Sequence, residues 1–517
     1  MHTTINRKLE YVFHGLVVCL FLLLLPASLK AQAVLGAQNT ALGGGGTAYL
    51  DGYKATLWNP ANLVIRDRPG NWHFGLGHTG ILYEPVLSTG VAGDQYFNFT
   101  DTYFPYRINS ADITTAQREA ILDNNYAGGE LVSQHQTRAE VVLGGALWQG
   151  DGKAYSLVAR ARFASRIEVG RGWYSDAFVD AGDRQVRDLT LHHQRNHLYE
   201  LSFGYAREFT FINGLFPQIN KLYVGIAPKV VLAGPSLDLA YSARYLRSEE
   251  GANTVFSRKF SYRSTGNYSR GTLAYRSGLG PQQAIREHFD RRLGIDNTGY
   301  GAGVDFGLTY VIPLGDDLST IARNSESAIV DKSIRIAFSV NDVGIVRYDG
   351  NPLRLSAPRD TTTQAVESVS RSMFIGADGQ YLSFFDDLGQ LPNPINADGN
   401  PKTESYTTLL PTSINAGLLL ELSTFRLMGD LTLGLNNTAF NTTKLAFHLG
   451  LEARPIQKVP LRFGTRLAAG LPTRLGIGTG FESRYWDFNI GTQILIRSRT
   501  LTSEMVGGAF AGIQLHL

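Results

Sequence analysis

The sequence predicts an all-β protein: a transmembrane antiparallel β-barrel of about 14 strands, with an N-terminal plug segment and short helical loop insertions. Three observations predict this fold class. Apolar and polar residues alternate through many segments, the chain opens with the features of a secretory leader, and its last residues form an amphipathic strand. Alternation of period two gives a strand two different faces.

The leader is the first of these features along the chain. Arg7 and Lys8 precede an apolar run over residues 16–25, and small residues follow up to Ala31. A basic start, a short apolar run and small residues are typical of a signal peptide. We expect cleavage after Ala31, with Ala33 as the alternative, and localisation in the cell outer membrane after export.

Composition agrees with a barrel without requiring one. Hydrophobic residues make up 43% of the 517 residues, and the mean hydropathy is -0.10. A strand with one lipid-facing side and one wet side averages to neutral. The net charge of +3 gives no reason to expect nucleic acid as a partner. The only cysteine, Cys19, lies in the leader, so a mature chain has no thiol for a disulfide, a zinc site or a nucleophile.

The strand pattern is clearest in the last third of the chain. Residues 473–482 and 486–496 alternate between bulky apolar side chains and Gly, Asn, Arg, Glu or Asp. Residues 300–312 and 334–341 repeat the pattern, and 141–163 read as a hairpin that turns at Gly150-Asp151-Gly152-Lys153. A tilted strand of about 9–11 residues crosses the hydrocarbon core of a bilayer.

The polar face distinguishes a barrel from the alternative, a secreted soluble β-protein. A soluble sandwich has bulky apolar side chains on its inward face. Here the face opposite the apolar one mixes glycine with charge, as a wet or plugged lumen requires. Most of these charges are expected to form salt bridges that hold the wall, and some to line a route for an amphipathic or anionic solute. The lumen-lining candidates are Arg160, Arg162, Asp305, Arg335, Arg462, Arg466, Arg474, Glu482 and Asp487.

The final segment, 507–517, places Ile513, Leu515 and Leu517 on one face. A chain that ends inside a strand leaves an open edge unless that strand closes a barrel. It is similar to the terminal strand that the barrel assembly machinery recognises, although that strand usually ends in Phe.

Some segments do not follow the strand pattern. Residues 110–123 and 282–293 predict short helices, and 358–411 a long loop with room for one strand. The predicted organisation is therefore a signal peptide over 1–31, a plug over 32–65 and a barrel over 66–517.

The predicted plug begins with a glycine run that tempts a phosphate-loop interpretation. No Gly-Lys-Ser/Thr follows it, and no strand-to-helix unit surrounds it. Four glycines instead let the chain coil where side chains would clash. The candidate plug residues are Gly43, Gly44, Gly45, Gly46, Asp51, Asn59, Pro60 and Ala61.

This glycine-rich segment, followed by Asp51 and then Asn59-Pro60-Ala61, resembles barrels of the FadL type. That superfamily includes the long-chain fatty-acid transporters and the PorV-type barrels of Bacteroidota, and in it the N-terminal segment folds into the lumen. Residues 339–344, 410–417 and 460–464 look similar to stretches of an uncharacterised Bacteroidota barrel family within the group. The resemblance identifies no fatty-acid site residue by residue.

The sequence offers little sign of catalysis or of a cofactor. His192, His193 and His197 cluster, but a metal site needs converging ligands, and the pattern places them at the entry to a strand. Neither Gly-x-Ser-x-Gly nor His-Glu-x-x-His occurs, so we expect no enzyme, no cofactor and no bound metal.

The preferred hypothesis is FadL-like transport of small hydrophobic molecules across the outer membrane. The rival is a PorV-like barrel that docks components of protein secretion or surface attachment, and an outer-membrane enzyme is a third. The expected partners are outer-membrane lipid, a hydrophobic ligand and, during biogenesis, the barrel assembly machinery.

Overall fold

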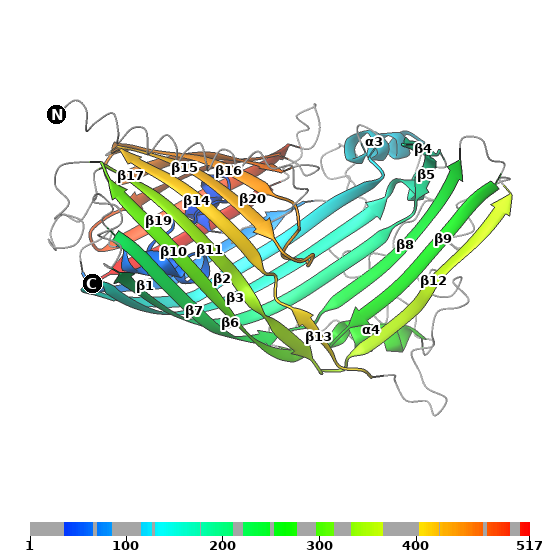
Figure 1. The fold of residues 1–517 in the computed structure, drawn as a ribbon, viewed down its shortest axis with the longest axis horizontal. Coiled ribbons are helices and arrows are strands. Elements are labelled where there is room, and N and C mark those ends of the chain that lie inside the picture. The colour runs from blue at the N-terminus through cyan, green and yellow to red at the C-terminus, as the bar shows by residue number, and fades with distance from the viewer. Residues whose placement is uncertain are drawn as a thin grey trace.

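The computed structural model describes residues 36–65, 70–84, 115–126, 130–175, 177–182, 184–209, 221–248, 253–276, 296–314, 332–365, 403–422, 424–468, 473–496 and 507–517. The predicted leader and the predicted helix over 282–293 lie outside these residues. Within them, fourteen antiparallel strands pair in a ring, and the last strand pairs with the first (Figure 1). The predicted fold class and strand number are confirmed.

The barrel strands follow one another around the ring in chain order. They are β1 (Trp72–Tyr83), β2 (Val132–Gly150), β3 (Lys153–Gly170), β6 (Leu191–Phe209), β7 (Lys221–Ala233), β10 (Gly299–Pro313), β11 (Lys332–Tyr348), β14 (Ser413–Leu422), β15 (Phe425–Gly434), β16 (Ala446–Ile456), β17 (Val459–Ala468), β18 (Thr473–Glu482), β19 (Trp486–Ile496) and β20 (Gly507–His516). Closure joins β20 to β1, from Tyr83 opposite Gly507 to His73 opposite His516, so neither strand leaves an open edge.

The two ends of the barrel differ in their connections. At the end where β1 begins and β20 finishes, which we call the terminal end, four connections are turns of two or three residues. One is the predicted hairpin turn, where Gly152 has φ 65° between β2 and β3. The opposite end, the loop end, carries the long connections 84–131, 234–298 and 349–412.

The outer surface of the barrel is apolar along each strand. On β6, Leu201 and Phe203 are half exposed, while Ser202 between them is fully buried on the inner side. Ile477 on β18 and Phe338 on β11 show the same outward exposure. Exposed aromatic side chains gather near the terminal end: Trp72, Tyr155, Phe425, Tyr485 and Trp486. This arrangement is what a transmembrane barrel presents to lipid.

One side of the barrel wall rises beyond the rest at the loop end. There β2, β3 and β6 run for 18 or 19 residues, against 10 or 11 for β14 to β19. The sheet continues through strands outside the ring, which are β4 (Val179–Ala181), β5 (Arg184–Asp188), β8 (Leu237–Ser248), β9 (Asn253–Ser264) and β12 (Leu353–Ala365). The first five residues of β6 pair with β8, and the sheet then continues to β9 and β12 (Figure 1).

The long predicted loop over 358–411 needs correction in its described parts. Residues 358–365 belong to β12, which pairs with β9, and β13 (Tyr406–Leu409) pairs with the end of β11. Two strands therefore replace the single strand allowed for. The sequence obscured both, because residues 359–364 are polar on both faces and β13 is only four residues long.

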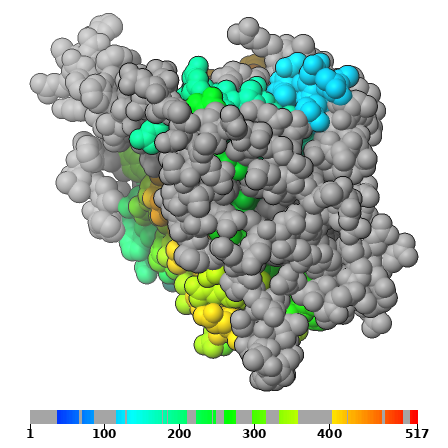
Figure 2. Space-filling view, turned by 90° about the vertical axis from the view of Figure 1, so that its right-hand side faces the viewer, coloured from blue at the N-terminus to red at the C-terminus, as the bar shows by residue number. Residues whose placement is uncertain are grey.

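The helices are short and lie in the connections or before β1. The predicted helix near 110–123 is present as α3 (Thr115–Asn125), at one side of the loop end (Figure 2). In the same view, yellow-green atoms of the β11–β12 region lie at the other side. The sequence did not predict α4 (Asn267–Arg276), which hydrogen-bonds to β9 through Tyr262 and Thr272. Among the described residues, no helix is both long enough and apolar enough to cross a membrane.

A β-bulge interrupts β11 and changes which side chains face inward. Asp305 on β10 lies opposite both Asn341 and Asp342, and Asp342 has φ 57°. Alternation predicts one inward side chain at this level, but the bulge turns both Asn341 and Asp342 inward. Beyond it the outward parity shifts from Phe338 to Val343.

Candidate functional site: the barrel interior

Residues 36–65 lie inside the barrel as a buried N-terminal segment. It contains α2 (Ala37–Ala41) and two short 3-10 helices, η1 (Gly52–Leu57) and η2 (Pro60–Val64). Every one of the fourteen strands approaches it. The approaching wall residues are His78, Gly145, Ser156, Gly204, Gly225, Thr309, Asn341, Gly417, Asp430, His448, Gly464, Gly476, Gln493 and Gln514.

The glycine run forms a tight turn against the wall, which we call the glycine turn (Gly43–Gly46). Gly43, Gly44 and Gly46 have φ values of 86°, 97° and 155°, which favour glycine. A Cβ on Gly43 would lie 2.4 Å from the carbonyl oxygen of Thr465, and one on Gly45 would lie 2.6 Å from Cβ of Asp430. Both the backbone conformation and the close approach therefore require glycine here.

Asp430 and His448 hold the glycine turn from neighbouring strands. The Asp430 carboxylate accepts hydrogen bonds from the amides of Gly46 (3.0 Å) and Thr47 (2.7 Å) and from Oγ1 of Thr47 (2.8 Å). His448 lies opposite Asp430 in the β15–β16 pair, and its Nδ1 is 2.8 Å from the carbonyl oxygen of Gly43. Both side chains are fully buried, so the hairpin β15–β16 clamps the turn.

The Asn59-Pro60-Ala61 stretch packs on the opposite wall. Asn59 caps the start of η2, because its Oδ1 accepts a hydrogen bond from the amide of Ala61. Nδ2 of Asn59 donates to Oγ1 of Thr309 at 2.8 Å. A Cβ on Gly225 would lie 2.2 Å from the carbonyl carbon of Pro60. The Asn59-Pro60-Ala61 stretch therefore lies directly against the wall at positions where glycine leaves room for it. Asp51 precedes η1 in an extended conformation and is partly buried.

Tyr49 of the segment joins a buried ionic cluster near the terminal end. Its hydroxyl donates to Glu452 at 2.5 Å, and Glu452 also accepts from Arg462 at 2.7 Å. Arg462 bridges to Glu482 at 2.5 Å. Two of the predicted lumen residues therefore meet here, with Glu452 as a partner that the prediction did not include.

A second ionic cluster surrounds Asp342 above the segment. Arg162 lies 2.8 Å from its carboxylate, and Lys229 lies 2.7 Å from both Asp342 and Asp305. Arg160 pairs with Glu140 at 3.2 Å and also with Glu200, which Arg162 shares. The structure thus brings the predicted residues Arg160, Arg162 and Asp305 together in one cluster.

The four other predicted lumen residues lie in separate places. Arg335 pairs with Glu421 at 2.7 Å, and Arg474 reaches Glu84 at 2.8 Å. Arg466 lies opposite Arg474 in the β17–β18 pair. Asp487 lies at the terminal end, 2.9 Å from Nε2 of His516. All nine candidates are buried on the inner side of the wall.

The sequence contains a signal for some of the charged partners that were not predicted. Glu200 shows the inward parity of its strand, so alternation combined with a search for opposite charges would find it. Lys229 follows Pro228 in a strand whose pattern is weak. Asp342 could not be found by parity, because the bulge at Asn341-Asp342 reverses the alternation.

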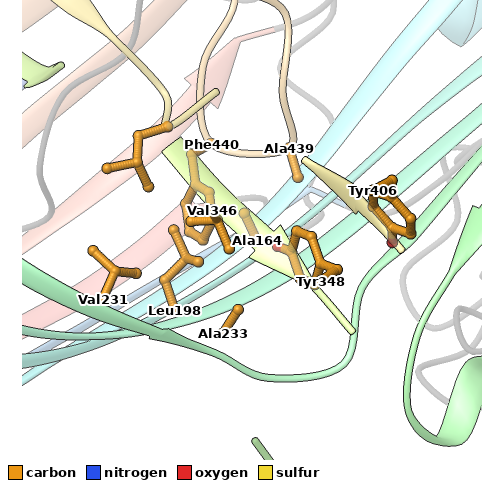
Figure 3. Packing of buried hydrophobic residues seen from close by; sticks show 10 residues of the cluster. Ala164, Leu198, Val231, Ala233, Val346, Tyr348, Tyr406, Ala439 and Phe440 are labelled. Atoms are coloured by element: carbon orange, nitrogen blue, oxygen red, sulfur yellow. The ribbon is translucent and has the colours of Figure 1, made fainter. Parts of the chain in front are cut away.

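A cluster of buried apolar residues lies near the second ionic cluster, and we call it the upper cluster (Figure 3). Its members are Ala164, Leu198, Val231, Ala233, Val346, Tyr348, Tyr406, Leu410, Ala439 and Phe440. Ala439 and Phe440 belong to the connection 435–445 between β15 and β16, which folds inward. The carbonyl oxygen of Ala439 accepts from Gln136 on β2 at 2.7 Å, and the Phe440 ring lies 4.9 Å from the Arg162 guanidinium.

The clustered histidines do not converge. His192 and His193 are neighbours on β6 and point to opposite faces. His192 lies between Asp238 (3.1 Å) and Glu168 (3.5 Å), while Nε2 of His193 lies 3.1 Å from Ser165 Oγ. Burial raises the pKa of Asp238, but its contacts with His192 and Arg263 outweigh that and hold it at about 2. Across the described ranges, no three His, Cys, Asp or Glu side chains are placed to hold a metal ion.

Comparisons with known proteins identify a family and a general likeness. The model of a family of unknown function, DUF5723, matches residues 69–492. No curated protein matches. The P. putida toluene transporter TodX is 13% identical over 93% of this chain and 96% of its own, with a TM-score of 0.40. The Ralstonia pickettii toluene transporter TbuX is 14% identical over 93% and 98%, with a TM-score of 0.39. Such scores carry no argument about what this chain binds.

Proposed function

This chain belongs to DUF5723, a family of unknown function, and we propose that it is an outer-membrane barrel that passes small hydrophobic molecules through a plugged interior. The proposal rests on the chain's own residues. The observation that carries it is the upper cluster, an apolar patch inside a barrel whose other inward positions are mostly glycine, polar or charged.

The outward surface supports the membrane placement. Charged side chains on a lipid-facing surface cost about 2–4 kcal/mol at the bilayer midplane, and the outward positions of the wall are apolar instead. Bacterial barrels have short periplasmic turns and long outer loops. The loop end would therefore face outward and the terminal end the periplasm.

The N-terminal segment serves as the plug in this proposal. It approaches all fourteen strands, so a molecule moving along the axis meets it. Removing the whole segment would break many buried hydrogen bonds, each worth about 0.5–1.5 kcal/mol net. A local shift of the glycine turn breaks a smaller set of contacts, among them the hydrogen bonds with Asp430 and His448, and we propose that this shift opens the path.

The hairpin β15–β16 links the upper cluster to the plug. Its connection 435–445 carries Phe440 in the upper cluster, and its strands carry Asp430 and His448 in the clamp. A hydrophobic molecule that displaces Phe440 would therefore move the same hairpin that holds the glycine turn.

Uptake by cells with an intact outer membrane tests the proposal. A phenylnaphthylamine fluorophore is the probe, because its fluorescence rises when it passes the outer leaflet. Cells that make the protein should take it up faster than cells that do not, and Phe440→Ala, which opens the upper cluster, should increase the rate further. Leu409→Ala is the matched control, since Leu409 is an exposed apolar residue of β13. Equal uptake with and without the protein would rule out this transport.

A second candidate, docking of secretion or surface-attachment components as in PorV-type barrels, is favoured by one observation. The wall extension through β8, β9 and β12 lies beyond the barrel, at the end that would face outward (Figure 1). Co-purification with a secretion component that is lost when β8 and β9 are removed, in cells without probe uptake, would support docking over transport. In either case we propose a non-enzymatic role.

A further inference from the structure

Asp430 is a buried acid that accepts its hydrogen bonds from the N-terminal segment. Its hydrogen bonds come from two amides and one hydroxyl of Gly46 and Thr47, and both carboxylate oxygens accept. The other lumen acids described above have a basic partner across a strand or across the barrel, as Glu421 has in Arg335. At Asp430, by contrast, the plug supplies the donors.

The surroundings of Asp430 contain few other titratable groups. From β14, Gly417 faces it, and a Cβ there would lie 2.8 Å from its Oδ2. From β16, His448 faces it. The segment presents Gly45, Gly46 and Thr47, none of which titrates. Arg466 lies one strand further along the same row, opposite His448.

We propose that Asp430 is a proton-operated latch on the plug, which holds the glycine turn when ionised and releases it when protonated. This inference rests on the proposed function, because it names what regulates the movement of the plug. An ionised carboxylate accepts all three hydrogen bonds. One proton taken from hydronium forms an O–H bond on Oδ1 and leaves water, so Oδ1 presents a donor toward the Thr47 hydroxyl. The two amide hydrogen bonds to Oδ2 then lose the added strength that the negative charge of the carboxylate gave them.

Protonation of His448, unlike protonation of Asp430, keeps its hydrogen bond to the glycine turn. Its contact with the Gly43 carbonyl requires a proton on Nδ1, since a carbonyl oxygen only accepts. A further proton on Nε2 leaves that hydrogen bond intact. Acidification therefore loosens the turn at Gly46-Thr47 and not at Gly43.

Thiol labelling measures the release directly. Cys19 is the only cysteine in the sequence, so Cys19→Ser gives a parent without thiols. Thr40→Cys places one reporter in α2, where Thr40 is buried and its hydroxyl makes no hydrogen bond within the described part of the chain. With the full-length barrel in lipid nanodiscs, we expect a water-soluble maleimide to label this reporter thiol about tenfold faster, after correction for thiolate content, at about pH 5 than at pH 8.

Asp430→Asn, added to the reporter, imitates the protonated acid, because the uncharged amide replaces one acceptor oxygen with an NH2 donor group. We expect fast labelling at both pH values and no remaining pH dependence. Thr432→Val is the matched control: Thr432 is buried two residues further along β15, and its hydroxyl has no hydrogen-bond partner among the residues described. This variant should label as the parent does.

The outcomes separate the latch from the transport proposal. Resistance of the barrel to unfolding in cold detergent confirms that each variant is folded. If the labelling rate of the parent is the same at both pH values, or if Asp430→Asn keeps the pH dependence of the parent, the latch is wrong. Labelling does not depend on uptake, so the latch can stand where probe uptake fails.

Discussion

At the scale of single residues, the inward charges pair with one another on the inner side of the wall. Alternation predicts that Arg160, Arg162 and Asp305 face inward, and they do. Alternation cannot predict which acid meets which base, since pairs such as Arg162 and Asp342 join residues 180 positions apart. Such pairs depend on the closure of the barrel, which no local pattern contains.

The first prediction concerns Asp342. Asp342→Ala leaves Arg162 and Lys229 buried without their shared acceptor, and breaking a buried pair costs about 3–5 kcal/mol. We expect the free energy of unfolding in urea, followed by tryptophan fluorescence in lipid, to fall by about that amount. Asparagine adopts a positive φ more readily than alanine, so Asp342→Asn should lower the free energy of unfolding by less. Equal stability of Asp342→Ala and the parent would contradict the cluster.

The second prediction compares two glycines of the wall. A Cβ on Gly464 would lie 2.1 Å from the carbonyl carbon of Leu42, whereas no described atom lies within 4 Å of a Cβ on Gly429. Gly464→Ala should therefore displace the glycine turn and raise the labelling rate of the Thr40→Cys reporter several-fold. Gly429→Ala should leave labelling unchanged. Similar labelling in both variants would mean that the segment does not lie against β17.

At the scale of elements, the regular strands could be predicted and the irregular ones could not. The hairpin β2–β3 and the strands β18 and β19 follow from alternation and a Gly-containing turn. The helix α4, the strand β13 and the inward fold of 435–445 depend on contacts with distant segments, such as Ala439 with Gln136. A segment inside the barrel was expected from the glycine run and from Asn59-Pro60-Ala61, but its contact with Asp430 joins residues more than 380 positions apart and could not be predicted.

The third prediction tests the outward face of an element. Ile477 lies outward in β18, and Tyr485 lies in the turn that follows at the terminal end. Arginine on a lipid-facing position costs about 2–4 kcal/mol near the midplane and about 0–1 near the interface. Ile477→Arg should therefore lower the free energy of unfolding in lipid far more than Tyr485→Arg. Equal losses would speak against a bilayer around β18.

At the scale of the whole molecule, we propose that the barrel, its N-terminal segment as a plug, and the upper cluster act together in transport. The wall holds the plug from all sides, while the hairpin β15–β16 carries both the Phe440 connection and the clamp on the glycine turn. In the proposed transport, passage requires movement of the glycine turn and leaves the rest of the N-terminal segment in place.

Two engineered disulfides provide the locks that test this claim. A Cβ on Gly450 would lie 2.9 Å from Cβ of Leu42, so a small shift allows Leu42→Cys/Gly450→Cys to join the residue directly before the glycine turn to β16. The hydroxyls of Thr56 and Ser156 are 2.6 Å apart, so Thr56→Cys/Ser156→Cys joins η1 to β3 and serves as the control lock.

Probe uptake by cells that make each locked protein, measured before and after a reductant, is the most direct test. We predict that the Leu42–Gly450 lock stops uptake and that the reductant restores it, while the Thr56–Ser156 lock has no effect. Undiminished uptake with the Leu42–Gly450 lock closed would contradict this claim, because hydrophobic molecules would then pass without any movement of the glycine turn.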